Sequence, residues 1–297
     1  MSSLPTFRRL LQGAALTLLI SPAFIAHAAG TDLQLTHFNP GNDAIFQVSS
    51  VLVSGQREAI LIDAQFGKSQ AEKVVQMVRD SGKTLTTIYI SHGDPDFYFG
   101  LDTVVAAFPD ARVVATEPTV QHIKETVDGK LAFWGPKLGA DAPSRAVIPQ
   151  VLKGSTLTLE GQALEITGLD GPQPDRSFVW IPSLKAVVGG VVVFGNLHVW
   201  MADTQTPQSH KDWLATLSRI EALKPVSVIP GHYAPGAPLN LESVRYTQGY
   251  IRAFDAQTAK DADSAALIAA MKAQYPQAGA AASLELSAKV AKGEMKW

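Results

Sequence analysis

The sequence contains no cysteine among its 297 residues. Disulfide bonds are therefore excluded, and stability has to come from the core and from any bound metal. A metal site in this chain must use histidine, aspartate or glutamate, because thiolate ligands are missing. Such a donor set favours zinc, iron or manganese.

Charged residues are also scarce, and neither sign dominates. They make up 18% of the chain and leave a formal net charge of −2. A basic patch for nucleic acid or for an anionic membrane surface is therefore not expected. The hydrophobic share of 46% is enough for one large core. We expect a small-molecule substrate as the partner, while the composition sets no oligomeric state.

Long hydrophobic runs are missing except near the N-terminus. There, two arginines precede an apolar stretch over residues 10–25, and a small-x-small cleavage site ends at Ala28. The stretch is too short for a stable transmembrane helix. A signal peptide over residues 1–28 is predicted, with a membrane anchor or a buried helix as the alternative; Sec and Tat export both stay open. The mature domain, residues 29–297, is then periplasmic or secreted and needs no membrane.

The first half of the mature chain alternates between strand and helix patterns. A capping box, Ser69-Gln70-Ala71-Glu72, opens a helix that stops at Gly82. A second helix is predicted over residues 101–108. Strands are predicted over residues 44–53, 59–63, 86–90 and 111–116. Strands that alternate with helices predict a sheet with helices on its faces.

The second half is predicted to be richer in strands. Residues 129–149 contain several glycines and prolines and are predicted to form a long loop or lid that carries Phe133 and Trp134. A helix capped by Ser209 and a helical tail from Leu241 follow later. Strands are predicted over residues 156–159, 163–167, 178–181, 186–194 and 225–229. No linker divides the chain, so we expect one α/β domain with two β-rich halves.

A polar loop follows the strand at residues 86–90. It presents His92, Asp94 and Asp96 at alternate positions. Alternate residues of an extended segment share a side, so an imidazole and two carboxylates can converge on one cation. The alternative is a turn in which Asp96 caps a helix. Open α/β sheets hold their ligand sites at the carboxyl ends of strands, which is where this loop lies.

With these residues the chain resembles the metallo-β-lactamase superfamily. The loop of that family is Thr/Ser-His-x-His-x-Asp-His followed by a glycine. Three further segments agree in order and spacing, namely Leu61-Ile62-Asp63, Gly189-Gly190 and Ile229-Pro230-Gly231-His232. The resemblance covers roughly residues 43–233 and implies an αββα four-layer sandwich.

The resemblance implies a set of metal ligands with gaps. His92 matches the first ligand histidine and His232 the last one. Asp94 stands where the family has a second histidine, and a carboxylate can still bind a cation there. Asp96 matches the aspartate that binds metal and positions the attacking water, so it is the implied catalytic residue. Phe97 replaces a ligand histidine.

Two other ligand positions of the family lack their usual residue. The middle histidine should fall within residues 168–176, where only Asp170 and Asp175 offer carboxylates. Gly190 stands in place of a bridging aspartate and cannot ligate. His198 is expected to line the pocket or replace a lost ligand, or else to be a packed or capping histidine. The remaining set fits one divalent metal, zinc first, with iron or manganese as alternatives, better than two metals.

Three more polar residues have simpler interpretations. His122 and His210 lie in helix patterns and are predicted to be solvated or to cap helices. Asp63 is expected to orient the ligand loop, as it does in the family.

The resemblance implies a metal-dependent hydrolase. Metal-bound water would attack an ester, lactone, amide or thioester, with Asp96 orienting the water or carrying a proton. Phe97 and Gly190 favour an alternative, a non-catalytic binding protein that kept the fold and lost the metal. A metal-dependent lyase, isomerase or oxidoreductase is the third alternative.

Overall fold

The computed structural model of this chain describes residues 1–2 and 33–297. The signal peptide predicted over residues 1–28 lies outside the described residues except for Met1 and Ser2, so export stays a prediction. From Leu33 onward the chain forms one compact unit. None of the helices in the described part combines the length and apolar character that crossing a membrane requires.

The first sheet has six strands in the order β1-β2-β3-β4-β5-β6. Strands β1 to β3 pair antiparallel, whereas β3 to β6 pair parallel, with helices in the connections. The strands are β1 (Gln34–Phe38), β2 (Ser50–Ser54), β3 (Glu58–Ile62), β4 (Thr84–Ile90), β5 (Arg112–Ala115) and β6 (Gln150–Val151).

The second sheet has five strands in the order β12-β10-β9-β8-β7, and a short parallel pair joins β11 to β13. Its neighbours are antiparallel except for β10 and β12. The strands are β7 (Thr156–Leu159), β8 (Gln162–Thr167), β9 (Phe178–Ile181), β10 (Ala186–Val188), β11 (Phe194–Gly195), β12 (Ser227–Val228) and β13 (His232–Tyr233).

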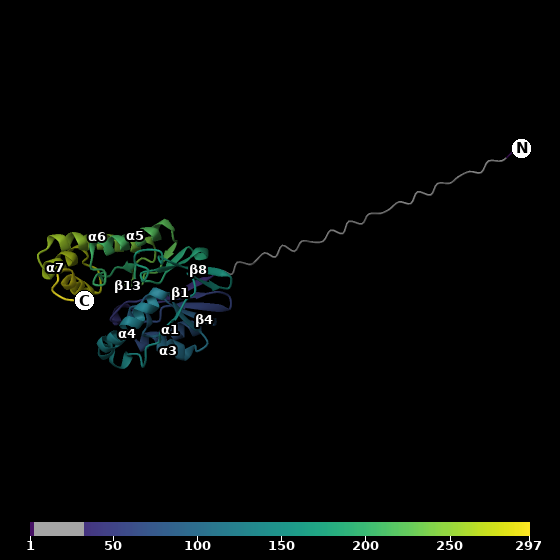
Figure 1. Ribbon diagram of the computed structural model, residues 1–297, viewed down its shortest axis with the longest axis horizontal. Helices are drawn as coiled ribbons and strands as arrows, with labels where there is room; N and C mark the ends of the chain where they lie inside the picture. The colour runs from purple at the N-terminus through teal and green to yellow at the C-terminus, as the bar shows by residue number, and fades with distance from the viewer. Residues whose placement is uncertain (3–32) are drawn as a thin grey trace. The chain divides into compact units, whose positions relative to one another are not determined.

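Helices cover the outer side of each sheet (Figure 1). Helices α1, α3 and α4 lie beside the first sheet, and α5 to α7 lie on the far side of the second, which confirms the αββα sandwich. The helices are α1 (Lys68–Asp80), α2 (Pro95–Tyr98), α3 (Leu101–Ala107), α4 (Glu117–Leu138), α5 (Pro207–Ala222), α6 (Leu241–Lys260), α7 (Ser264–Gln274) and α8 (Ala281–Ala291). Three 3-10 turns complete the fold, at Gly41–Asp43, Gly139–Asp141 and Pro182–Leu184.

The alternation of side chains along β3 divides the core into two layers. Leu61 belongs to the cluster that the helices cover, whereas Ile60 and Ile62 belong to the cluster that contains side chains of both sheets. This follows from the period of two residues in a strand, which sends neighbours to opposite faces. Each such side chain is fully buried and contributes about 1.5–3 kcal/mol through burial of its apolar surface.

The loop predicted over residues 129–149 is wrong in its first half. Helix α4 continues to Leu138, starting from Thr116, whose hydroxyl caps it, and from a proline in the first turn. Gly129 and Gly135 lie where an added Cβ would meet nothing within 4 Å, so glycine there weakens the helix without breaking it. Pro136 falls in the last turn, where the lost hydrogen bond matters least.

Several predicted boundaries also shift. The strand predicted over residues 186–194 ends at Val188, because Gly189 and Gly190 have φ angles of 68° and 78° that no strand can continue. Helix α5 is capped by Thr206, whose hydroxyl accepts from the backbone N–H of Ser209, so Ser209 is not the cap. The strands predicted over residues 44–53 and 225–229 are shorter, at Ser50–Ser54 and Ser227–Val228.

A buried hydrogen-bond network ties the ends of three strands together. The carboxylate of Asp63, just past β3, accepts from the backbone N–H of Ser91 at 2.8 Å and from its hydroxyl at 2.6 Å. The same hydroxyl accepts from the backbone N–H of Gly190 at 2.7 Å, just past β10. Burial raises the pKa of Asp63 to about 7, although the hydrogen bonds from Ser91 oppose that rise. This network holds the start of the polar loop after β4.

We expect Ser91→Ala to destabilise the protein by about 2–3 kcal/mol, because it leaves a buried carboxylate oxygen and a buried N–H without their partner. The free energy of unfolding from urea titrations measures this loss. The control is Ser218→Ala on the exposed face of α5, which should change stability by less than about 0.5 kcal/mol. Equal effects of the two changes would contradict the role assigned to Ser91.

Candidate functional site

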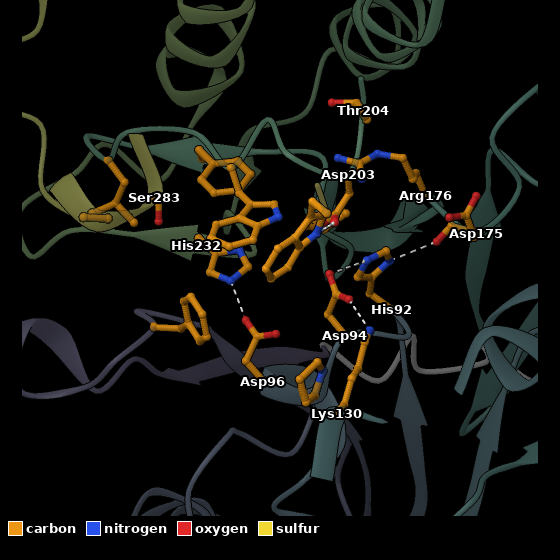
Figure 2. A pocket seen from close by; sticks show the side chains of 18 of the residues that line it. His92, Asp94, Asp96, Lys130, Asp175, Arg176, Asp203, Thr204, His232 and Ser283 are labelled. Carbon is orange, nitrogen blue, oxygen red and sulfur yellow. Dashed lines mark hydrogen bonds and ion pairs between the residues drawn. The ribbon is translucent and has the colours of Figure 1, made fainter. Parts of the chain in front are cut away.

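A pocket of about 510 Å³ opens where the loop after β4 meets segments of the second sheet. It is large enough for a small organic molecule. Figure 2 shows its polar side chains in two groups, one around Asp94 and one around Asp96. The residues that line it include Phe46, His92, Asp94, Asp96, His122, Lys130, Trp134, Asp175, Arg176, Phe194, His198, Trp200, Asp203, His232 and Trp297.

The first group centres on Asp94, which precedes the short helix α2. One carboxylate oxygen lies 3.1 Å from Nε2 of His92, and the other accepts from Nζ of Lys130 at 2.6 Å. Burial alone would raise the pKa of Asp94, but the charges of His92 and Lys130 more than offset it and hold that pKa well below its usual range. Burial likewise opposes the charged form of His92, yet Asp94 raises the pKa of this imidazole. The negative charge of Asp94 and the positive charges of His92 and Lys130 therefore stabilise one another.

Lys130 reaches this group from helix α4. Besides Asp94, its ammonium donates to the backbone carbonyl of Gly93 at 3.3 Å and to Nε2 of His122 at 3.2 Å. The His122 ring packs so tightly on Gly93 that a Cβ there would lie 2.5 Å from the ring. Burial, and after it the charge of Lys130, lowers the pKa of His122. His122 thus lines the pocket, while its side chain is 39% exposed and so is also partly solvated, as predicted.

The second group pairs Asp96 with His232. Oδ2 of Asp96 lies 2.7 Å from Nε2 of His232, and both side chains are buried (Figure 2). The ring of Phe194 stacks on His232 with centroids 5.0 Å apart. Phe97 separates the two groups, since its ring lies 5.3 Å from the rings of both His92 and His232.

Arg176 enters the same pocket from the segment before β9. Its side chain is stacked over the ring of Trp213 at 4.2 Å, and the residue is only 6% exposed. Nε and Nη2 have no hydrogen-bond partner within the described part of the chain. Burial lowers the pKa of this guanidinium, although nearby carboxylates such as Asp203 oppose the effect. A buried cation with unused donors requires acceptor atoms from a ligand or water.

Of the three further residues predicted for the site, one lies outside the pocket and two line it. Asp170 lies outside the pocket, where its exposed carboxylate forms a two-point ion pair with Arg219 at 2.8 and 3.0 Å. Asp175 lines the pocket, and its backbone carbonyl lies 3.1 Å from Nδ1 of His92. His198 also lines the pocket, with Nδ1 3.0 Å from the hydroxyl of Tyr250.

His210 is neither solvated nor a helix cap. It is 7% exposed and is held between the carboxylate of Asp255 and the backbone carbonyl of Thr204. It therefore fixes the segment between the pocket and helix α5, and it does not line the pocket.

Sequence patterns missed the cations of the pocket and its aromatic wall apart from Trp134, which the predicted loop or lid already included. Lys130 is not predicted as a site residue from the sequence, because the end of its helix is predicted to be a loop. A usable signal exists, since His122, Thr126 and Lys130 follow one another at intervals of four residues and therefore share a helix face. Arg176 carries no such signal, because it lies in an irregular segment.

Comparison with models of known protein families shows which family the chain belongs to. A family model of the metallo-beta-lactamase superfamily matches residues 44–232, so the chain belongs to this superfamily. Members of the superfamily are mostly hydrolytic enzymes and typically bind divalent metals, usually zinc.

Individual relatives are distant or only partly covered. A metallo-beta-lactamase family protein from Thermus thermophilus has a TM-score of 0.60 and 16% identity, over 87% of this chain and 91% of that chain. A metallo-beta-lactamase from Pontibacter korlensis has a TM-score of 0.53 and 19% identity, over 74% and 99%. These likenesses concern the fold alone. The uncharacterized protein YobT of Bacillus subtilis (strain 168) is 37% identical over 84 residues, 28% of this chain and 34% of that protein, so the match spans about a third of that relative.

The side chains as placed do not fit the single metal ion that the sequence predicts. Catalytic zinc sites use three protein ligands, whereas His92 with Asp94 and Asp96 with His232 form two separate pairs. Within residues 1–2 and 33–297, no three His, Asp or Glu side chains are grouped to hold a metal ion. Gly190 supplies no third ligand either, because a Cβ there would lie 2.1 Å from the carbonyl oxygen of Ser177.

His198 provides a pH test of the pocket wall. Burial lowers its pKa to about 4, below the unfolded value of about 6.5. Between these pH values the unfolded chain binds a proton that the folded chain does not, so stability is lost as the pH falls from about 6.5 to 4. We expect His198→Gln to reduce this loss by roughly 1–2 kcal/mol, measured by urea titration at pH 7 and pH 4.5. An unchanged difference between the two pH values would contradict the assignment.

Proposed function

We propose that the chain is a hydrolase that cleaves a small ester, lactone, amide or thioester with its own side chains. The observation that carries this proposal is the pairing of Asp96 with His232 in the pocket. His232 holds one carboxylate oxygen at 2.7 Å, while Oδ1 has no recorded hydrogen-bond partner in the part of the chain that the structure describes. An oriented carboxylate with one oxygen available in a pocket is suited to act as a general base.

The reaction follows from that arrangement. Oδ1 of Asp96 takes a proton from a water molecule, and the resulting hydroxide attacks the carbonyl carbon of the substrate. His232 keeps the carboxylate in position through Oδ2. When the tetrahedral intermediate collapses, the carboxyl group of Asp96 returns the proton to the leaving oxygen, nitrogen or sulfur. No step requires a metal ion.

Arg176 is suited to bind the oxygen on which negative charge develops. Its Nε and Nη2 donors are buried and lack protein partners among the described residues, and its guanidinium lies over the ring of Trp213. Preorganised donors of this kind stabilise an oxyanion more than a neutral carbonyl, which is what accelerates the chemical step. The ammonium of Lys130, below Asp94 in Figure 2, adds positive charge to the group around Asp94.

The aromatic wall of the pocket favours a substrate with an apolar body. The rings of Phe46 and Trp134 lie 5.3 Å apart, and those of Trp200 and Trp297 lie 5.2 Å apart. Such rings bind apolar or planar groups through their large surface. The signal peptide predicted over residues 1–28 favours a substrate that is met outside the cytoplasm.

We expect Asp96→Asn to lower kcat at least about 100-fold, since the amide keeps the shape and cannot accept the proton. The assay is a panel of small esters, lactones, thioesters and amides, run on chelator-treated protein. The matched control is Asp170→Asn, outside the pocket, which should leave kcat unchanged. A full rate in Asp96→Asn would remove this residue from the chemistry.

Arg176→Met should keep the apolar stem and remove the guanidinium, with its donors and its contact with Trp213. We expect kcat/KM to fall at least about 10-fold, which corresponds to about 1.4 kcal/mol of lost transition-state binding. Circular dichroism checks folding, and Arg219→Met at the exposed pair with Asp170 is the control. Equal kcat/KM in both variants would show that Arg176 does not bind the reacting substrate.

A second candidate function is ligand binding without turnover. The observation in its favour is that Phe97 and Gly190 occupy positions where the family has metal ligands. Trp134, Trp200 and Trp297 line the pocket, so bound ligand should change tryptophan fluorescence. Saturable quenching by compounds of the same panel, with no product formed, would establish this function in place of hydrolysis.

A further inference from the structure

Lys130 occupies an unusual position for a lysine. Its side chain is 21% exposed and its ammonium lies against the loop that carries the predicted metal ligands. All three of its N–H donors have acceptors: Oδ1 of Asp94 at 2.6 Å, Nε2 of His122 at 3.2 Å and the carbonyl of Gly93 at 3.3 Å. A lysine held by three partners is a fixed point charge and is not a solvated surface group.

The groups around that ammonium are the kinds that bind zinc. Nε2 of His122 lies 3.9 Å from Oδ1 of Asp94, on which the ammonium also sits. His92 lies against the other carboxylate oxygen of Asp94 at 3.1 Å. The rings of His92 and His122 are nearly parallel, with centroids 6.4 Å apart. The ammonium thus contacts the carboxylate and one imidazole directly, and the second imidazole lies on the other oxygen of that carboxylate.

We propose that the ammonium of Lys130 is a built-in cation that takes the place of a divalent metal ion beside His92, Asp94 and His122. It neutralises Asp94 and fixes the loop, which are tasks that a metal would perform. A divalent ion at the same place is repelled by the ammonium and would have to displace it from its three acceptors. Arg176 adds a second positive charge to this side of the pocket. The inference does not depend on the proposed hydrolysis.

With Lys130 in place, His92, Asp94 and His122 are not grouped as a set that could hold a metal ion within residues 33–297. Removal of the ammonium should let these three side chains close on one ion. In Lys130→Met the apolar stem is kept, and Asp94, His92 and His122 lose their internal cation. These residues supply the oxygen and nitrogen donors that zinc uses in three-ligand sites. The same helix offers a matched control in Lys137→Met, because Lys137 is exposed and its ammonium lies over the ring of Phe133.

The experiment is calorimetric titration of chelator-stripped proteins with zinc chloride, with bound zinc counted by plasma mass spectrometry after gel filtration. We expect Lys130→Met to retain one equivalent of zinc and to bind it at least about 100-fold more tightly than the wild type and Lys137→Met. In the Lys130→Met background, His122→Ala should abolish the gain, whereas His232→Ala should leave it intact.

Two results would overturn the proposal. One is stoichiometric zinc binding by the wild type as tight as that of Lys130→Met, and the other is no gain in a folded Lys130→Met protein. If that variant does not fold, the zinc content of the wild-type protein tests the proposal. Stoichiometric zinc in the wild type that is lost in His92→Ala would contradict a built-in cation, whereas the absence of bound zinc would support it.

Discussion

The hydrogen bonds that join Asp63, Ser91 and Gly190 are the constraint on which the rest of the site depends. They fix the ends of β3, β4 and β10 against one another inside the sandwich. The polar loop begins at Ser91, so the network sets where His92 and the residues after it start. The other side of the pocket is tied to the same point, because a Cβ on Gly231 would lie 2.1 Å from the carbonyl oxygen of Gly190. His232 follows directly, and its position depends on that close backbone contact.

This framework explains why the pocket keeps the outline of a metal centre without its ligand set. Gly190 is required by the backbone packing that holds the three strand ends, so no ligating side chain can stand there. Phe97 fills the space between the two His–Asp pairs with an aromatic ring. Positive charge comes instead from Lys130 and Arg176, which the chain supplies from helix α4 and from the segment before β9. The negative charge of the loop after β4 is thereby balanced by cations of the protein itself.

The fold and the centre of the site could be predicted from the sequence, whereas the cations could not. The loop after β4 and the Pro-Gly-His turn are local patterns at strand ends, and their four candidate residues all line the pocket. Lys130 is brought to Asp94 by helix α4, across 36 residues of sequence, and that helix was obscured by Gly129, Gly135 and Pro136. Asp170 shares its segment with Arg176, yet only the arginine points into the pocket, where its guanidinium lies over the ring of Trp213. Which of these side chains point into the pocket depends on tertiary packing, which local sequence patterns do not reveal.

We infer that a side chain of this protein, and not a metal ion, provides the cation next to Asp94. The most direct measurement is anomalous diffraction at the zinc edge from crystals of the wild-type protein grown with excess zinc chloride. We expect no anomalous peak among His92, Asp94 and His122, with the ammonium of Lys130 still on Asp94. A peak ligated by at least two of these residues, with Lys130 displaced, would contradict it.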